Sequence, residues 1–381
     1  MPEPGSAAGP GPTDRALGID LAKVLAANLI VWHHLAFYGP MADRAAQLWP
    51  ALIDWLAQYG REAVPVFLVV GGYLAARSLA PDGRLTRGPS MFSRLTDRYL
   101  RLSAPFAVVV VLAVLANLLA ARWMQHDSIS EVLGPHQALA HMLLVHDLIG
   151  IPALTAGAWY VAIDFQLYAL LLVLLTLARG SEKRVWIGRR HGPWMVALLG
   201  AVSMLYFNRI SDLDIVGVYF FGAYALGALA AWWAPKAHRR PGLLLMAALA
   251  SLALWIEWRD RLAVALVVAI WLAVLVSVRP VVGSSSAWSF VHRWSERSYA
   301  LFLVHFPVCL LVNAAFTRWA SHEAEVQALG LVSAWLASLW AASLFHRRVE
   351  QPLARFIRAW QQGSTSAAAA KADRIGHGSA R

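Results

Sequence analysis

Ten long apolar segments dominate the sequence and limit what the chain can fold into. Each is long enough, or nearly so, to cross the roughly 30 Å hydrocarbon core of a bilayer as an α-helix. Helices suit this environment because they satisfy every backbone N–H and C=O group internally. The sequence therefore predicts an all-α, polytopic membrane protein with about ten transmembrane helices, near residues 17–38, 62–80, 102–121, 156–178, 193–209, 214–234, 241–257, 260–278, 296–317 and 325–346.

The composition argues against a soluble protein. Hydrophobic residues make up 59% of the 381 residues and charged residues 14%, whereas soluble domains are about half apolar and about a quarter charged. A water-soluble globule of this composition would expose large apolar patches. The net charge of +11 would indicate nucleic acid in a soluble protein. In a membrane protein it is typical of basic cytoplasmic loops, so no nucleic-acid partner is expected.

The distribution of basic residues predicts the topology. With the N-terminus in the cytoplasm, 25 of the 33 Lys and Arg residues fall in cytoplasmic segments and seven fall on the opposite side, while Lys23 lies within the first span. This alternation holds at every loop, so both termini are predicted to be cytoplasmic. The expected location is the inner (plasma) membrane, which the chain crosses many times.

The chain divides into one membrane domain and two polar ends. Residues 1–14, rich in Pro and Gly, are predicted to be disordered, residues 15–358 to form the membrane domain, and residues 359–381 to form a disordered cytoplasmic tail. The first apolar segment contains Asp20 and lacks a small-residue cleavage site, so it reads as a retained helix and not a signal peptide. With one cysteine and no Cys/His zinc spacing, no metal is expected.

Ionisable side chains inside a membrane span are costly, which makes each a candidate functional residue. In the first predicted helix, Asp20, Lys23 and His34 share a stripe about 60° wide, whereas His33 points elsewhere. Asp20 and Lys23 either form an i,i+3 ion pair that anchors the helix end or belong to a site. The His34 imidazole is a natural proton acceptor near neutral pH, with a structural hydrogen bond as the alternative.

Two further predicted helices contain buried ionisable groups. Asp164 and Tyr168 lie one turn apart in the fourth helix, and Asp164 lies in the same half of the membrane as His34. We expect a hydrogen bond from His34 to Asp164 that holds the imidazole tautomer, as in hydrolase triads; a helix–helix clamp is the alternative. His305 in the ninth helix either packs against neighbouring helices or belongs to the site. The nearby Cys309 is expected to pack.

Arg98 and Arg101 lie one turn apart where the third predicted helix leaves the cytoplasm. They either contact lipid phosphates or form a fork for a phosphorylated ligand from the cytosol. The Gly71–Gly72 pair of the second predicted helix has no side chains, which permits close approach of another helix or of a ligand.

Several separated motifs, in the same order, resemble the acyltransferase 3 family of integral membrane acyltransferases over most of residues 15–358. Two positions depart from the family pattern: Gly71 stands where Ser is usual, and Asp164 replaces the usual Glu. The matching motifs are Asp20 and Lys23 followed after ten residues by His34, Val66 to Tyr73, Arg98-x-x-Arg101 with Pro105, Trp159 to Tyr168, Ser298-Tyr299, His305-Phe306-Pro307, and Val349 to Leu353.

The resemblance implies transfer of an acyl group, often acetyl, from cytosolic acyl-CoA to a hydroxyl group. Acceptors in the family include surface polysaccharides, glycans, lipid-linked sugars and small metabolites. Many relatives have a fused soluble esterase-like domain. Here the membrane domain is expected to act alone or with a separate periplasmic or extracellular partner.

A catalytic scheme follows from these residues. The phosphates of acyl-CoA dock against the arginines, and His34 acts as general base on the acceptor hydroxyl. Tyr168 or His305 donates to the tetrahedral oxyanion. The rival interpretation is a proton-coupled transporter that uses the same buried Asp, Lys and His; an inactive membrane scaffold is a third. The candidate catalytic residues are His34, Asp164, Tyr168 and His305, and the candidate acyl-CoA-binding residues are Lys23, Arg98 and Arg101.

Overall fold

The computed structural model describes residues 14–132, 134–184, 191–277 and 286–361, which contain helices and turns and no strand. The predicted all-α fold is confirmed. The α-helices are α1 Asp14–Phe37, α2 Pro40–Ala45, α3 Pro50–Tyr59, α4 Val64–Leu79, α5 Met91–Ala120, α6 Pro135–Met142, α7 Ala158–Arg184, α8 His191–Leu205, α9 Gly217–Trp233, α10 Arg240–Ile256, α11 Asp260–Ser277, α12 Ser286–Glu296, α13 Ser298–Trp319 and α14 Ala324–Phe345. Shorter helical turns are η1 Gly60–Ala63, η2 Asp147–Ile149, η3 Phe207–Arg209, η4 Ser211–Leu213, η5 Ala237–Arg239 and the π-helix η6 His346–Glu350.

Each of the ten predicted segments contains a helix, but the helices differ in length. The helices α8, α9, α10 and α11 have 15, 17, 17 and 18 residues, or roughly 22–27 Å at 1.5 Å per residue. The chain is thus a multi-pass membrane protein, while ten crossings and two cytoplasmic termini remain predictions. Within the described residues, six stretches are long and apolar enough to cross a bilayer: Leu17–Phe37, Pro50–Leu79, Met91–Ala120, Ala158–Gly180, Ser298–Trp319 and Ala324–Gln361.

The predicted boundaries shift at both ends of the membrane domain. The first helix begins at Asp14, and the last helical stretch continues to Gln361. Residues 359–361, predicted to belong to a disordered tail, are therefore helical. Ile357 is buried on this extension, and such an apolar contact favours continuing the helix. The remainder of the two predicted disordered ends lies outside the described residues.

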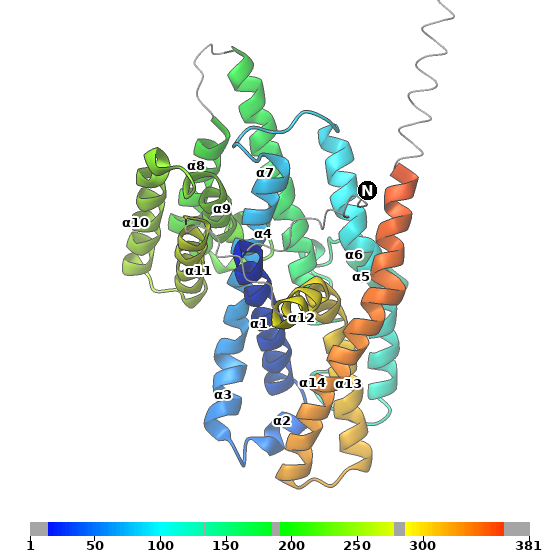
Figure 1. Cartoon of the computed structure of the whole chain (residues 1–381). Helices are drawn as coiled ribbons and strands as arrows, with labels where there is room; N and C mark the ends of the chain where they lie inside the picture. Colours follow the sequence, from blue (N-terminus) through cyan, green and yellow to red (C-terminus); the bar gives the residue numbers. More distant parts are fainter. Residues whose placement is uncertain (1–13, 133, 185–190, 278–285, 362–381) are drawn as a thin grey trace, which may run out of the picture.

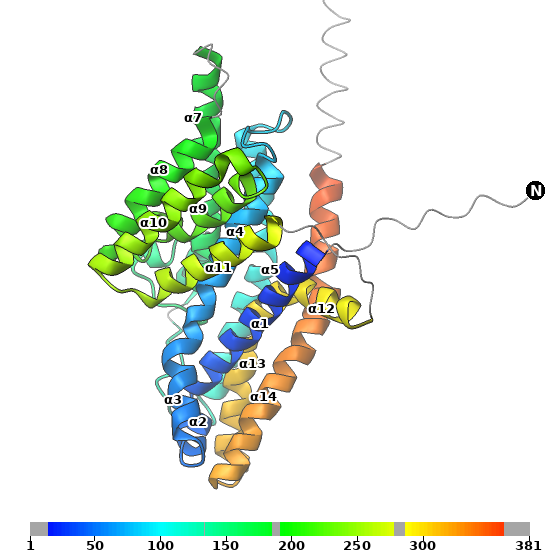
Figure 2. The ribbon, with the colours of Figure 1, turned by 60° about the vertical axis from the view of Figure 1, so that its left-hand side comes forward.

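The helices form two adjoining groups. Helices α8 to α11 stand together beside α4 and α7, while α1, α13 and α14 form the other group (Figures 1 and 2). α4 packs closely on α9, which attaches it to the group formed by α8 to α11. A Cβ on Gly72 would overlap the carbonyl oxygen of Tyr224, and a Cβ on Gly227 would overlap that of Val69. The predicted close approach at the second helix is thus observed, because only glycine leaves room for it.

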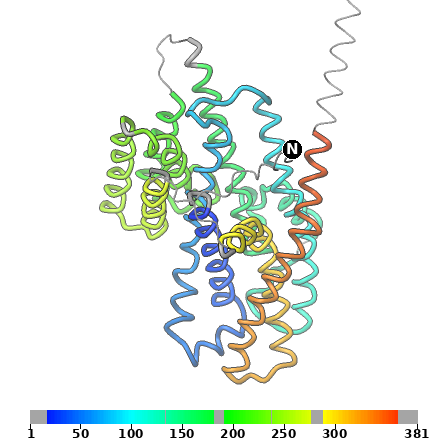
Figure 3. The backbone as a smooth tube through the Cα atoms, viewed as in Figure 1, coloured from blue at the N-terminus to red at the C-terminus, as the bar shows by residue number. Residues whose placement is uncertain are grey.

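Segments far apart in the sequence lie side by side at the centre of the molecule. The first helix, α1, runs alongside α13 and α14 near the end of the chain (Figure 3). The short helix α12 lies across the start of α1. This arrangement places the ionisable residues of α1 against α12 and α13, and those of α7 against α5.

Candidate active site

A pair of histidines is buried between α1 and α13. Nδ1 of His34 lies 2.7 Å from Nε2 of His305, and the two rings are nearly parallel with centroids 4.9 Å apart. His305 is completely buried and His34 nearly so. The structure therefore joins two of the predicted catalytic residues directly.

The hydrogen bonds of this pair fix its tautomers. Nδ1 of His305 lies 3.1 Å from the carbonyl oxygen of Leu301, and because a carbonyl only accepts, this nitrogen carries the proton. In the neutral ring Nε2 of His305 is then an acceptor, so Nδ1–H of His34 donates to it. Nε2 of His34 is left with its lone pair and has no partner in the part of the chain that the structure describes, which is the state that a general base requires.

The predicted hydrogen bond between His34 and Asp164 is wrong. Oδ2 of Asp164 accepts instead from Nη2 of Arg98 at 2.5 Å, and this ion pair joins α5 to α7. The guanidinium of Arg98 also lies over the ring of Tyr168, 5.3 Å from its centroid. Arg98 pairs with the buried carboxylate of Asp164 because α5, which carries Arg98, packs against α7. Tyr168 contacts Arg98 and is not among the residues that line the neighbouring cavity.

A cavity of about 350 Å³ brings the remaining candidates together. It opens between α1, α4, α5, α7, α12 and α13, and Phe302 forms part of its wall. The ring of Phe302 lies 6.1 Å from the ring of His305. Phe302 thus lies both at the cavity wall and beside the histidine pair. The polar or charged residues that line the cavity are Lys23, Arg98, Arg101, Tyr160, Asp164, Ser295, Glu296, Ser298, Tyr299 and Glu350.

The predicted ion pair between Asp20 and Lys23 does not form. Asp20 accepts instead from Nδ1 of His292 at 2.7 Å and from the hydroxyl of Ser295 at 2.5 Å, which ties α12 to α1. Lys23 has no hydrogen-bond or ion-pair partner in the described part of the chain and lines the cavity. Its ammonium group is therefore available to an anionic ligand.

The two predicted phosphate-binding arginines differ in what holds them. Arg101 donates to Asp97 at 2.8 Å, and 43% of its side chain is exposed. Arg98 is less exposed and is bound to Asp164, and its Nε is buried without a partner. Arg101 is thus free to turn toward a ligand, whereas Arg98 primarily neutralises a buried carboxylate.

A comparison with protein families decides the class of protein. Residues 17–347 match the model of the family described as "Acyltransferase domain". The chain belongs to the acyltransferase 3 family. A search of curated proteins and a search of solved structures found no match. The family match supports a membrane acyltransferase over the transporter and scaffold interpretations, and the matched region includes both histidines and the Arg98–Asp164 pair.

The substitution of Gly for the usual Ser at position 71 leaves space in the wall of this cavity. A Cβ on Gly71 would lie 3.4 Å from the ring of Tyr224 and 3.9 Å from Oδ1 of Asp164. The hydroxyl of Tyr224 is buried and has no hydrogen-bond partner. Sequence reasoning missed this tyrosine, since a tyrosine within an apolar helix shows no sign of what it faces.

The other polar groups near the histidine pair have structural partners. Nδ1–H of His33 donates to the carbonyl oxygen of Leu56 at 3.0 Å. The thiol of Cys309 is buried and lies 3.7 Å from the hydroxyl of Ser338. Both residues therefore have structural roles, as the sequence predicts for Cys309.

A second pair of histidines lies outside the membrane-spanning helices of the acyltransferase. His141 and His146 stack with centroids 4.1 Å apart. His141 donates to the carbonyl oxygen of Gln137 and accepts from the backbone N–H of Leu154. Burial lowers the pKa of each histidine to about 4, because desolvation disfavours the charged ring. Both rings are therefore neutral at pH 7 and act as packing groups.

Proposed function

We propose that this membrane acyltransferase moves an acyl group, expected to be acetyl, from cytosolic acyl-CoA to a hydroxyl group of an acceptor. The observation that supports this most is that the cavity lies close to the buried pair of histidines. The cavity contains Lys23, which has no partner among the described residues. Phe302 lines the same cavity and lies beside His305, which is hydrogen-bonded to His34.

Charge complementarity favours docking of the CoA phosphates at Lys23 and Arg101. A phosphate binds best to a cationic side chain that does not have to break a strong existing ion pair. Lys23 has no such pair among the described residues, and that of Arg101 with Asp97 is exposed. Three acids also line this cavity, but each has a partner. Asp164 is bound to Arg98, Glu350 accepts from His346 at 2.8 Å, and Glu296 lies 3.8 Å from His292. The pantetheine arm then extends toward Phe302 and carries the thioester to the histidines.

His34 provides the proton transfer that the reaction needs. An acceptor hydroxyl oxygen attacks the thioester carbon while Nε2 of His34 takes the hydroxyl proton. The C–S bond of the tetrahedral intermediate then breaks and CoA leaves as a thiolate, whose pKa near 8.5 makes it a good leaving group. That thiolate takes the proton back from His34. His305 holds the tautomer throughout, which is the task first expected of Asp164.

The acceptor is a hydroxyl-bearing surface glycan, lipid-linked sugar or small metabolite, and the protein acts in the inner (plasma) membrane. A separate periplasmic or extracellular partner would extend its action to acceptors that the membrane domain does not reach.

Mass spectrometry of cell-surface glycans, lipids and secreted metabolites tests this proposal. Cells that express the protein should contain species 42 Da heavier than their parents, the mass that one acetyl group adds, and cells with His34→Ala should lack them. The matched control is His33→Ala, which removes the neighbouring imidazole and should leave the products unchanged. Equal amounts of product in His34→Ala cells, at equal protein level, would refute the assignment.

A further inference from the structure

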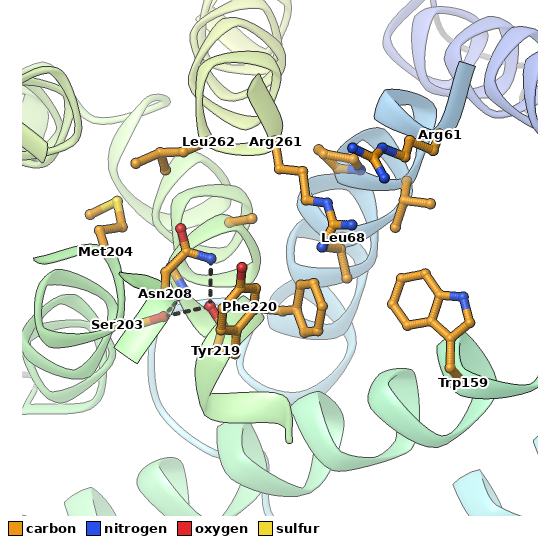
Figure 4. A pocket seen from close by; sticks show the side chains of 14 residues that line it. Arg61, Leu68, Trp159, Ser203, Met204, Asn208, Tyr219, Phe220, Arg261 and Leu262 are labelled. Atoms are coloured by element: carbon orange, nitrogen blue, oxygen red, sulfur yellow. Dashed lines mark hydrogen bonds between the residues drawn. The ribbon is translucent and has the colours of Figure 1, made fainter. Parts of the chain in front are cut away.

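A second, smaller pocket lies on the other side of α4 from the first cavity. It encloses about 50 Å³ and is lined by two arginines, Arg61 and Arg261, together with Trp159. Figure 4 shows both guanidinium groups directed toward this space. The positive-inside rule assigns both arginines to the side opposite the cytoplasmic arginines of the first cavity.

Some polar side chains of this pocket already have hydrogen-bond partners, and others do not. The hydroxyl of Ser203 donates to the backbone of α9, and Asn208 is bound by both Tyr219 and Arg259. Arg261 has no hydrogen-bond or ion-pair partner within the described ranges of the chain. Arg61 lies 3.5 Å from Glu62, and 59% of its side chain is exposed. The pocket thus offers two guanidinium groups and holds about one phosphate-sized group.

A long apolar groove lies directly beside the pocket. It encloses about 790 Å³ between α1, the α3–α4 stretch and α11, and along α1 it extends from Gly18 to Leu29. The eleven steps from Gly18 to Leu29 rise about 17 Å along the helix, close to half the thickness of the hydrocarbon core. Leu21 and Leu25 are exposed along it, so the groove faces the lipid and is one leaflet deep.

One wall separates the pocket from the groove. This wall consists of η1 and the start of α11, where neighbouring residues face opposite ways: Arg61 and Arg261 line the pocket, and Glu62 and Asp260 line the groove. Asp260 already accepts from the indole of Trp258. The pocket with its two arginines and the apolar groove therefore lie on the two faces of one thin wall.

We propose that pocket and groove together bind an amphiphile with a phosphate group and a hydrocarbon chain. The phosphate is held between Arg61 and Arg261, and the chain lies in the groove against α1. That this amphiphile carries the acceptor hydroxyl rests on the proposed function, whereas its binding does not. The site would then hold the acceptor on one side of the aromatic residues Trp159 and Tyr160 while acyl-CoA occupies the cavity on the other.

The test measures binding without turnover. The protein is purified in a nonionic maltoside detergent, which has no phosphate group, and titrated calorimetrically with farnesyl phosphate, with farnesol and with inorganic phosphate. Farnesyl phosphate should bind at least tenfold more tightly than either of the others, since only it fills both parts of the site. Equal binding of farnesol, or of inorganic phosphate, would overturn the proposal.

Three variants locate the site. Arg261→Ala should weaken farnesyl phosphate roughly 10- to 100-fold, the effect of losing one charge-assisted hydrogen bond. Ala22→Trp should weaken it by filling the groove. The matched control is Arg209→Ala, which removes a nearby exposed arginine that pairs with Glu257 and should have no effect. If Arg261→Ala binds as tightly as Arg209→Ala, the pocket is not the phosphate site.

Acyl transfer is measured separately on the same samples as release of free CoA. Arg-dependent binding without turnover would refute the proposed function and leave this site standing. CoA release together with farnesyl phosphate binding that does not depend on Arg261 would refute this site and leave the proposed function standing. Size-exclusion profiles and melting temperatures confirm that each variant is folded before it is compared.

Discussion

Replacing His305 with alanine should lower kcat by roughly 2- to 30-fold and leave KM for acyl-CoA nearly unchanged, because kcat loses only the roughly 0.5–2 kcal/mol by which the bond to His34 strengthens between the resting and transition states. In the resting enzyme the 2.7 Å bond from His34 to His305 joins two neutral rings, and such bonds contribute about 1 kcal/mol. When His34 takes the acceptor proton, the same bond becomes charge-assisted and stabilises the transition state by about 1.5–3 kcal/mol. Each 1.36 kcal/mol corresponds to a factor of ten in rate.

The assay follows CoA release by the purified protein in nanodiscs, with kcat and KM determined separately. His305→Gln provides a rescue, because its amide oxygen can accept from Nδ1–H of His34 and should recover part of the lost kcat. His33→Ala serves as the matched control, since its ring is within 5.0 Å of His34 but bonds only the backbone of α3.

Two results would refute this reasoning. If His305→Ala and His33→Ala lowered kcat equally, the effect would come from disturbed packing around α1. If His305→Ala raised KM for acyl-CoA and left kcat unchanged, His305 would belong to the donor site and would not position the base.

Three other parts of the molecule give further predictions. Arg98→Ala should destabilise the fold by about 3–5 kcal/mol, because it leaves a buried carboxylate unpaired, whereas Arg101→Ala should raise KM for acyl-CoA with little change in melting temperature; equal melting temperatures would contradict this. Gly71→Ala should be tolerated and Gly72→Ala should abolish folded protein, as judged by size-exclusion chromatography, because only the second Cβ meets a backbone carbonyl. Between pH 6.5 and about 4 the unfolded chain binds protons at His146 that the folded chain does not, so the melting temperature should fall as the pH drops through that window, and His146→Phe should reduce this dependence.

Much of the fold follows from the sequence because the bilayer restricts what an apolar segment can do. Every one of the ten predicted segments contains a helix, since a helix satisfies its own backbone hydrogen bonds. The cost of ionisable groups in the membrane likewise identified Lys23, His34, Asp164 and His305 as candidates. These inferences depend only on residue type and spacing along one helix.

The pairing of those candidates could not be predicted in the same way. Equal depth in the membrane suggested that His34 meets Asp164, but depth is a coordinate along one axis and does not say which helices are neighbours. The tertiary structure places α13 beside the end of α1 and α5 beside α7, so His34 pairs with His305 and Asp164 with Arg98.

The sequence by itself thus determined the class of fold, the set of costly buried groups and the family that their motifs indicate. Only the tertiary structure decided which groups His34 and Asp164 meet, that Lys23 has no partner among the described residues, and that a charged pocket adjoins an apolar groove. The reason is physical: a side chain's depth and face are set by its own helix, but its partner is set by the packing of others. Gly72 illustrates this, because its missing side chain matters only where the backbone of α9 passes.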